Sequence, residues 1–552
     1  TCKDTRTPSL LHNFRYTIKI MLYRPVGFSR GAKTQQVSYF VNFEETMTDI
    51  TTPQWVKDAI FYQIFPDRFA RSARLQHPGL HFEEWDASPT PHGFKGGDLY
   101  GIAEHLDYLQ NLGVNALYLN PVFASASNHR YHTYDYYNVD PLLGGNEALR
   151  YLLDEAHARG MRVVLDGVFN HASRGFWQFH HVLENGDGSP YVDWFYFDRD
   201  RLERKKPWGV YPHPEEEEAL KKGEDSLTAI GYRAWWHLPA LPKFNTQTPA
   251  VREFIFSVAE RWIRFGIDGW RLDVPAEIDD DSFWQEFRRR VKAINPEAYI
   301  VGEIWERANR WLQGDQFDAV MNYPVGEACI SFFGRASLNL MEIRKAGYGP
   351  RIYPIDGHEF LRRLDDIRRW YHPEIVHAQL NLFDSHDTPR YLTAVGGDRE
   401  ALKLGWLTLF TYPGAPCIYY GNEIGLDGGH DPACRKAFPW DQSRWDQDLL
   451  SYVKTCAAMR KIHPVLRTGE FHPLFAAEDV VAFARRNTRE TLVIVLNASA
   501  SSQDMAAPAE HLHLPDGRLT TLLGSSVAYV TNGRFNVTGL PPRSGIVVGC
   551  QS

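Results

Sequence analysis

Cysteines are few in this 552-residue chain, and no two of them have the spacing of metal ligands. Zinc and iron–sulfur sites take pairs of cysteines separated by a few residues, so the scattered positions argue against such a site. Isolated thiols favour a reducing compartment, and we predict a cytoplasmic protein. The even number leaves disulfides and secretion open. The six positions are Cys2, Cys329, Cys417, Cys434, Cys456 and Cys550.

The sequence also has no long apolar run and no cluster of basic residues. No stretch approaches the ~20 apolar residues that span a bilayer, and no signal-peptide pattern is visible. The first residue is Thr1 rather than Met, which leaves a removed leader or a missing segment open. The 60 Lys and Arg are outnumbered by 68 Asp and Glu, for a formal net charge of −8. We therefore expect neither nucleic acid nor a membrane as a partner.

Aromatic residues are abundant. They make up 14% of the chain, with 16 Trp and 27 Tyr. Sugar rings stack on aromatic faces, so this composition suits a carbohydrate-active enzyme, although a large α/β core would also use these residues. The chain is too long for one hydrophobic core, and about two to four domains are expected.

The pattern of apolar residues changes twice along the chain. Residues 1–54 alternate apolar and polar positions and predict a partial N-terminal β domain. From 55 to 463 short apolar strands alternate with amphipathic helices, which predicts an α/β fold, a closed (β/α)8 TIM barrel. No glycine-rich phosphate loop follows the first strand, which argues against an open doubly wound sheet. The eight predicted strands are Ile60–Pro66, Ala116–Pro121, Arg162–Asn170, Gly269–Val274, Tyr299–Trp305, Ala319–Pro324, Ala378–Asp384 and Cys417–Gly421.

Two further regions interrupt or follow this pattern. Residues 171–241, after the third strand, are too long for a simple loop and predict an inserted subdomain on the active-site side. Its run Glu215–Glu218 suits a solvated helix face better than a binding patch. From 464 to 552 the helices stop, and runs such as Val480–Arg485 and Thr491–Asn497 predict a C-terminal β-sandwich.

The stretch Gly266–Glu277 organises the rest of the chain. It predicts a short buried strand that ends in charged residues, with Arg271 and Asp273 on one face because side chains alternate along a strand. An arginine beside an aspartate favours the ionised carboxylate. Such a carboxylate at the carboxyl end of a barrel strand suits a nucleophile, while a structural Arg–Asp pair is the alternative.

Four short motifs each fall at the carboxyl end of a strand predicted above. They are Asp166-Gly-Val-Phe-Asn-His171, Gly269-Trp-Arg-Leu-Asp273, Gly302-Glu-Ile-Trp305 and Phe383-Asp-Ser-His-Asp387. In this order they resemble the conserved blocks of the α-amylase family of glycoside hydrolases, and the resemblance covers the chain from about Trp55 onward. A further block, Leu241-Pro-Lys-Phe-Asn245, is similar to the cyclomaltodextrinase, neopullulanase and maltogenic amylase subgroup.

The resemblance implies three catalytic carboxylates. Asp273 is predicted as the nucleophile and Glu303 as the acid/base, because a retaining glycosidase needs two carboxyl groups about 5 Å apart. Asp387 is predicted to bind the hydroxyls of the cleaved sugar. Glu303 must be protonated at working pH, which requires a raised pKa.

Other residues are predicted to bind substrate, with a packing role as the alternative for several of them. Arg271 would hold Asp273 ionised, and Asp166 would orient Arg271. Histidines would donate to hydroxyls of the cleaved sugar, and Tyr131 would stack beneath it. The predicted substrate-binding set is Arg271, His171, His386, Tyr131, Lys243 and Glu277.

The sequence departs from the family in three places. Relatives often carry a calcium loop where this chain has Ala70–His77, and arginines there would repel a cation. We therefore expect no required cofactor and no metal ligand, with calcium doubtful. The N-terminal β domain is about half the family's length, which leaves a homodimer open. His132 replaces an Asp beside Tyr131.

We predict retaining hydrolysis of α-1,4-glucosidic bonds in cyclodextrins and maltooligosaccharides, with pullulan and glycosyl transfer as extensions. An exo-acting maltodextrin α-glucosidase or a transglycosylase is the first alternative. An inactive carbohydrate-binding scaffold is the alternative from another class. It predicts loss of a catalytic carboxylate, and all three are present.

Overall fold

The computed structural model describes residues 50–203, 208–345 and 351–551. The predicted N-terminal β domain, residues 1–54, lies almost wholly outside the described residues. Among the described residues, no helix is long and apolar enough to cross a bilayer.

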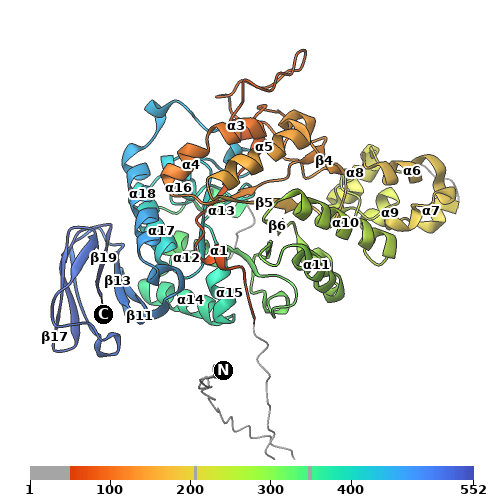
Figure 1. The fold of residues 1–552 in the computed structure, drawn as a ribbon. Coiled ribbons are helices and arrows are strands. Elements are labelled where there is room, and N and C mark those ends of the chain that lie inside the picture. The colour runs from red at the N-terminus through yellow and green to blue at the C-terminus, as the bar shows by residue number, and fades with distance from the viewer. Residues whose placement is uncertain (1–49, 204–207, 346–350, 552) are drawn as a thin grey trace, which may run out of the picture. The chain divides into compact units, whose positions relative to one another are not determined.

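Eight parallel strands close into a barrel, which confirms the predicted TIM-barrel fold (Figure 1). Around the barrel their order is β1-β10-β9-β8-β7-β6-β5-β2. Short apolar sequences form these strands because residues facing the barrel interior and residues facing the helices are both buried. The strands are β1 (Phe61–Ile64), β2 (Ala116–Leu119), β5 (Arg162–Gly167), β6 (Gly269–Leu272), β7 (Tyr299–Gly302), β8 (Ala319–Asn322), β9 (Leu380–Asn381) and β10 (Ala415–Tyr419).

Helices surround the barrel, but one connection has none. Between β7 and β8 there is only a 3-10 turn, Asn309–Trp311, although helix-forming sequence was expected after every strand. Gly, Asn, Asp and Gln crowd this segment and favour turns. The other connections hold α3 (Leu99–Glu104), α4 (Leu106–Leu112), α5 (Gly145–Ala158), α10 (Pro249–Phe265), α11 (Asp281–Ile294), α12 (Tyr323–Phe333), α13 (Leu340–Lys345), α14 (Gly357–Arg369), α15 (Pro373–Ala378), α16 (Tyr391–Ala394) and α17 (Arg399–Thr411), and α18 (Gln447–Ile462) and α19 (Val465–Thr468) follow β10.

The helix α10 shows how local sequence sets these boundaries. Pro249 occupies the first turn, where its missing N–H is not needed. Gly266 ends the helix with φ 107°, a left-handed conformation that a residue with a Cβ rarely adopts. The buried face of the helix, which includes Val258 and Trp262, packs on the barrel, and the chain then enters β6.

Two short helices lie beside the first strand, and two short strands follow β2. A two-stranded antiparallel sheet, which the sequence pattern did not predict, follows β2 and carries the loop that contains Tyr131. These elements are α1 (Gln54–Lys57), α2 (Pro66–Phe69) and the pair β3 (Phe123–Ser125) and β4 (Thr133–Val139).

The insertion after β5 folds into short helices that project from the barrel (Figure 1). The isolated bridge of His171 with Lys243 joins the two ends of this segment, and that of Phe195 with Phe244 joins its middle to its end. The helix α8 has no buried residue, as the Glu215–Glu218 run predicted. The helices are α6 (Trp177–Asn185), α7 (Arg199–Glu203), α8 (Pro214–Lys221) and α9 (Ser226–Ile230).

Two antiparallel sheets follow the barrel. One has the order β11-β12-β13-β19-β16 and the other β14-β18-β17-β15. Arg485 on β12 is fully buried and donates to the carbonyls of Thr411 and Leu466, so this sheet is joined to the end of α17. The strands are β11 (Glu470–Ala476), β12 (Val480–Arg486), β13 (Glu490–Asn497), β14 (Gln503–Pro508), β15 (Gly517–Arg518), β16 (Thr520–Leu523), β17 (Val527–Thr531), β18 (Arg534–Leu540) and β19 (Ser544–Gln551).

Candidate active site

One buried arginine contacts three carboxyl groups at the carboxyl ends of β5, β6 and β7. Arg271 Nη1 lies 2.9 Å from Asp166 Oδ1 and 3.0 Å from Asp273 Oδ1. Arg271 Nη2 lies 2.9 Å from Glu303 Oε2. One oxygen of Asp273 and one of Glu303 are therefore held against the same guanidinium group, as a pair acting on one bond requires.

Glu303 follows β7, and two hydrogen-bond donors hold its carboxyl group in addition to the ion pair with Arg271. Trp305 Nε1 donates to Oε1 at 3.1 Å, and the backbone N–H of Val274 donates to Oε2 at 3.1 Å. Val274 has φ 36°, which is strained for a β-branched residue. This strained turn directs the N–H of the residue after Asp273 toward Glu303.

The contacts of Arg271 differ between the carboxyl groups of Asp273 and Glu303. Arg271 makes a hydrogen bond to Asp273, which favours the ionised form. Its Nη2 is close to Glu303 but has no hydrogen-bond partner among the described residues. Burial raises the pKa of Glu303, and the charge of Asp387 raises it further while Arg271 opposes the rise. The pKa is raised for both groups, so it is the hydrogen bond from Arg271 to Asp273 that assigns the ionised form to Asp273 and the proton to Glu303.

From the sequence, Arg271 was expected to keep Asp273 ionised. In the structure, Arg271 is not the largest influence on the pKa of Asp273. Burial is the largest influence and raises the pKa of Asp273 well above its usual range, with Arg271 opposing and Glu303 adding to the rise. The physical reason is that Arg271 is shared among three carboxyl groups. Asp273 Oδ2 is buried and has no hydrogen-bond partner among the described residues, so it is the oxygen free to attack a substrate.

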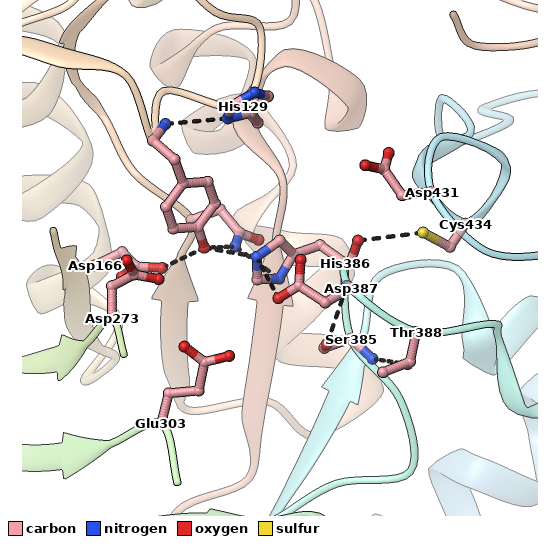
Figure 2. A network of polar contacts seen from close by, with 12 residues as sticks. His129, Asp166, Asp273, Glu303, Ser385, His386, Asp387, Thr388, Asp431 and Cys434 are labelled. Carbon is pink, nitrogen blue, oxygen red and sulfur yellow. Dashed lines mark hydrogen bonds and ion pairs between the residues drawn. The ribbon is translucent and has the colours of Figure 1, made fainter. Parts of the chain in front are cut away.

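Asp387 faces the same region from the end of β9. In Figure 2 the carboxyl groups of Asp273, Glu303 and Asp387 surround one space. The Asp387 side chain is 34% exposed, whereas those of Asp273 and Glu303 are 8% and 6% exposed. Arg435 Nη2 lies 3.2 Å from Asp387 Oδ1. The more open carboxylate is thus placed to accept hydrogen bonds from sugar hydroxyls.

His386 is buried and held in one tautomer by its neighbours. Gln63 Nε2 and Asn120 Nδ2 both donate to its Nδ1 at 3.0 Å, so the ring proton is on Nε2. Burial and two nearby arginines lower the pKa of His386 well below its usual range, so the ring is neutral. Nε2 lies 2.6 Å from the hydroxyl of Tyr131 and 3.1 Å from Asp387 Oδ2.

Tyr131 links His386 to Asp166. Its hydroxyl donates to Asp166 Oδ2 at 2.8 Å, and its ring lies parallel to the His386 ring with centroids 5.3 Å apart. Tyr118 donates to the same oxygen of Asp166 at 2.8 Å. Burial raises the pKa of Asp166 to about 6, against the attraction of Arg271. Asp166 therefore orients Arg271 and Tyr131, as the sequence suggested for Arg271.

His171 lies beneath a stack of aromatic rings from the insertion. Its ring is fully buried and parallel to that of Trp235, with centroids 5.0 Å apart. Trp236 stacks on Trp235 at 4.9 Å and is 75% exposed. Burial lowers the pKa of His171 to about 3, so it is neutral. The structure thus places His171 beneath an indole and leaves Trp236 as the exposed ring.

Lys243 and Glu277 are brought together at the edge of the site. Lys243 Nζ lies 3.0 Å from Glu277 Oε2 and donates to the Glu277 carbonyl at 2.9 Å. Their side chains are 18% and 45% exposed. The pair joins the insertion to the loop after β6, and each partner keeps an exposed polar surface for a ligand.

The loop Ala70–His77, where the family resemblance would place a calcium ion, has its surroundings occupied by protein donors. Arg71 Nε and Nη2 donate to the carbonyls of Lys95 and Glu83, so a guanidinium group already occupies these oxygens. Both carboxylate oxygens of Asp98 accept backbone N–H groups, from Ser72 and Gly101. The described residues of this loop therefore offer no set of oxygens for calcium.

Three residues of the site were not singled out from the sequence. Gln63 lies within an apolar strand and Asn120 directly follows one. A polar residue at such a position can be recognised in the sequence as a candidate site residue. Arg435 comes from the loop after β10, and its Nε donates to the His386 carbonyl at 2.8 Å. No local pattern marks it, because only the folded loop brings it to Asp387.

Comparisons with known proteins identify the family of the chain. Residues 63–463 match the family described as "Alpha amylase, catalytic domain". The chain belongs to the α-amylase family of glycoside hydrolases. Residues 471–548 match a second family, "Neopullulanase-like, C-terminal domain", so the predicted subgroup is also confirmed.

Relatives of this α-amylase family member cover most of its length. A cyclomaltodextrinase from Bacillus sp is 44% identical over 81% of this chain and 73% of its own. The structure of a debranching enzyme from Nostoc punctiforme is 46% identical, with a TM-score of 0.81 over 91% of this chain and all of that one. A cyclic α-maltosyl-(1→6)-maltose hydrolase from Arthrobacter globiformis is 35% identical, with a TM-score of 0.76 over 91% and 100% of the two chains.

Proposed function

We propose that this glycoside hydrolase cleaves α-1,4-glucosidic bonds in cyclodextrins and short maltooligosaccharides with retention of configuration. The observation that carries the proposal is Arg271, which holds an oxygen of Asp273 and an oxygen of Glu303 within 3.0 Å of one guanidinium group. The curated relative named a cyclomaltodextrinase supports the substrate class.

The reaction follows from the contacts of the two carboxyl groups. Asp273 Oδ2 attacks the anomeric carbon, and the bond between that carbon and the leaving oxygen breaks. Glu303 gives its proton to the leaving oxygen as the glycosyl-enzyme bond to Asp273 forms. Glu303, now a carboxylate, takes a proton from water, whose oxygen attacks the same carbon and releases Asp273.

Asp387 and His386 would stabilise the positive charge that develops on the sugar ring. Hydrogen bonds from the 2- and 3-hydroxyls to Asp387 strengthen as that charge grows. His386 Nε2–H stands beside Asp387 and can donate to a neighbouring hydroxyl oxygen. If a second sugar replaces water in the last step, the same residues carry out glycosyl transfer.

Product analysis tests the proposal. The protein is incubated with β-cyclodextrin, maltotriose, pullulan and starch, and the products are separated by chromatography. We expect ring opening of cyclodextrin and short maltooligosaccharide products. Glucose released one unit at a time with cyclodextrin untouched would instead establish the exo-acting glucosidase, and no cleavage of any substrate would leave the scaffold alternative.

The variant Glu303→Gln tests the assignment of the acid. It keeps the shape of the side chain but removes its proton, and we expect turnover of maltotriose to fall by roughly 10²–10⁴-fold. The control is Glu374→Gln on α15, whose carboxylate contacts Lys57 and Thr52 among the described residues. Turnover that survives Glu303→Gln would show that another group protonates the leaving oxygen.

We further propose that the protein works in the cytoplasm. The five described cysteines are all unpaired, and four of them are buried. Buried free thiols suit a reducing compartment. Fractionation of the source cells followed by immunoblotting is the direct measurement, and recovery in the culture medium would contradict the proposal.

A further inference from the structure

A cavity of about 330 Å³ lies between β4, the start of α6 and α10, apart from the candidate active site. Its volume suits a small ligand. Among the described residues that line it there is none of the three catalytic carboxyl groups and none of the predicted substrate-binding side chains. We call it the Trp177 pocket; its main lining residues are Tyr134, Asp135, Tyr136, Trp177, Gln178 and Phe254.

Three packed aromatic rings form one wall of the Trp177 pocket. The side chains of Tyr136 and Phe176 are buried. The rings of Tyr136, Phe176 and Phe254 contact one another, with centroids between 5.6 and 5.8 Å apart. The Tyr136 hydroxyl also donates to the His171 carbonyl at 2.7 Å. This wall is therefore held in place by the protein, and a ligand would not have to order it on binding.

Two further aromatic side chains of the pocket remain exposed. Trp177 is 58% exposed and Tyr134 is 40% exposed. The Trp177 ring meets the Tyr191 ring edge-on, with centroids 5.2 Å apart and planes at 77°, so its orientation is held. Large aromatic side chains beside a cavity are typical of a surface that a ligand covers, because binding removes their apolar area from water.

Uncharged polar groups of the pocket have unused hydrogen-bonding capacity. The Tyr134 hydroxyl, the Trp177 indole N–H and the Gln178 side-chain amide make no hydrogen bond to any described residue. The hydroxyl and the amide can both donate and accept, and the indole can donate. The pocket therefore offers a mixed set of neutral donors and acceptors to a ligand.

The charge of the lining argues against an anionic ligand. Asp135 is the one charged side chain among the described lining residues. Its two carboxylate oxygens accept from the Tyr137 N–H and from Asn138 Nδ2, each at 2.8 Å. An anion would be repelled by this carboxylate and would meet no cation in the lining. A neutral ligand with apolar faces and several hydroxyls fits best, and a glucosyl unit has this chemistry.

We propose that the Trp177 pocket is a second glucan-binding site, which holds glucosyl units of a long substrate while another part of the same chain is cleaved. Trp177 would stack on the apolar face of a sugar ring, and Tyr134 and Gln178 would form hydrogen bonds to its hydroxyls. The inference deepens the proposed function and rests on it for the class of ligand.

The pocket and the candidate active site are close along the polypeptide. Tyr131 lies three residues before Tyr134, and His171 lies four residues before Gly175. Four extended residues span at most about 14 Å, so the edges of the two sites are within reach of one short glucan chain. Binding in the pocket would raise the local concentration of a long substrate at the catalytic carboxyl groups. A short substrate that occupies only the active site would gain nothing.

Counting binding sites on the full chain is the first test. Maltose, which is too short to occupy both sites at once, is titrated by calorimetry into Glu303→Gln and into the same protein carrying Trp177→Ala as well. We expect two maltose sites per chain in the first protein and one in the second. Equal numbers of sites in the two proteins would overturn the proposal.

Substrates of different length provide the second test, on the otherwise unchanged enzyme. For Trp177→Ala we expect kcat/KM for amylose to fall about 3–10-fold, which corresponds to the loss of one aromatic stacking contact, while kcat/KM for maltotriose changes by less than about twofold. The control is Ile462→Ala on α18, which removes a side chain that is 71% exposed and lies outside the pocket. It should leave both values as in the wild type.

The outcomes separate this inference from the proposed function. Equal falls with both substrates would show that Trp177→Ala acts on the catalytic centre or on stability, and would overturn the pocket's assignment. Unchanged kcat/KM with both substrates would also overturn it. Loss of self-association in sedimentation, with maltose binding unchanged, would identify the pocket as an interface between copies instead. A wild-type protein that cleaves neither substrate would refute the proposed function, while the count of maltose sites would still test the pocket.

Discussion

At the scale of single residues, one guanidinium group organises the candidate site. Arg271 is fully buried and contacts Asp166, Asp273 and Glu303. Its charge cannot ionise all three fully, so burial still raises the pKa of each carboxyl group. The alternation of side chains on β6 predicted that Arg271 and Asp273 would share a face. It could not predict that Arg271 would be shared, because the partners come from two other strands.

Tyr131 should matter through its hydroxyl as well as its ring. Tyr131→Phe removes the hydroxyl between Asp166 and His386, so Asp166 Oδ2 loses one of its donors and His386 Nε2 loses its 2.6 Å contact. Such a loss is about 1–3 kcal/mol, so we expect kcat/KM for maltotriose to fall by roughly 10–100-fold. The matched control is Tyr118→Phe, which removes a hydroxyl from Asp166 but leaves His386 untouched. Equal falls in the two variants would show that only Asp166 carries the effect.

At the scale of helices and strands, the barrel was predictable because its strands are short, apolar and buried on both sides. The catalytic motifs lie at the ends of those strands, so their convergence could be predicted as well. The hairpin of β3 and β4 was missed because register shifts interrupt its pairing. The position of Arg435 could not be predicted, since a long loop without periodicity delivers it to Asp387.

The contact between β12 and the barrel depends on Arg485. Its guanidinium group donates to the carbonyls of Thr411, Leu466 and Gly469, and no carboxylate pairs with it among the described residues. Arg485→Met would leave these carbonyls without a donor, and we expect a loss of about 2–5 kcal/mol in the free energy of unfolding.

Urea unfolding followed by circular dichroism measures this effect. The control is Arg486→Met, which alters the neighbouring, less buried side chain on the other face of the same strand. We expect that control to change the free energy of unfolding by no more than about 0.5 kcal/mol. Similar values for the two variants would contradict a special role for Arg485.

At the scale of the whole molecule, buried ionisable groups make stability depend on pH in two opposing directions. Burial lowers the pKa of His377 to about 4 and that of His171 to about 3. Their unfolded forms bind protons below about pH 6.5, so these groups remove stability as the pH falls. Burial raises the pKa of Asp384 and Asp166 to about 6. The folded form then binds protons more tightly, and these groups add stability as the pH falls through 6.

A single substitution isolates the histidine contribution. Between pH 8 and pH 5 the wild-type protein should lose about 1–2 kcal/mol of stability through His377, because only the unfolded chain takes up that proton. His377→Gln should not show this part of the loss. His358→Gln, at an exposed position on α14, is the control and should follow the wild type. Parallel curves for all three proteins would contradict the assignment.

The shared guanidinium group also has a consequence for inhibition. Asp166, Asp273, Glu303 and Asp387 face the site, and among the described residues the cations that contact these four carboxyl groups are Arg271 and Arg435. An intact sugar is uncharged, but its ring becomes cationic as the glycosidic bond breaks. A surplus of acidic groups therefore favours binding of sugar mimics that bear an amine over binding of neutral mimics. The protonated amine already has the positive charge that a sugar ring gains only in the transition state. Small ammonium compounds, including common amine buffers, should compete with glucans for the same space.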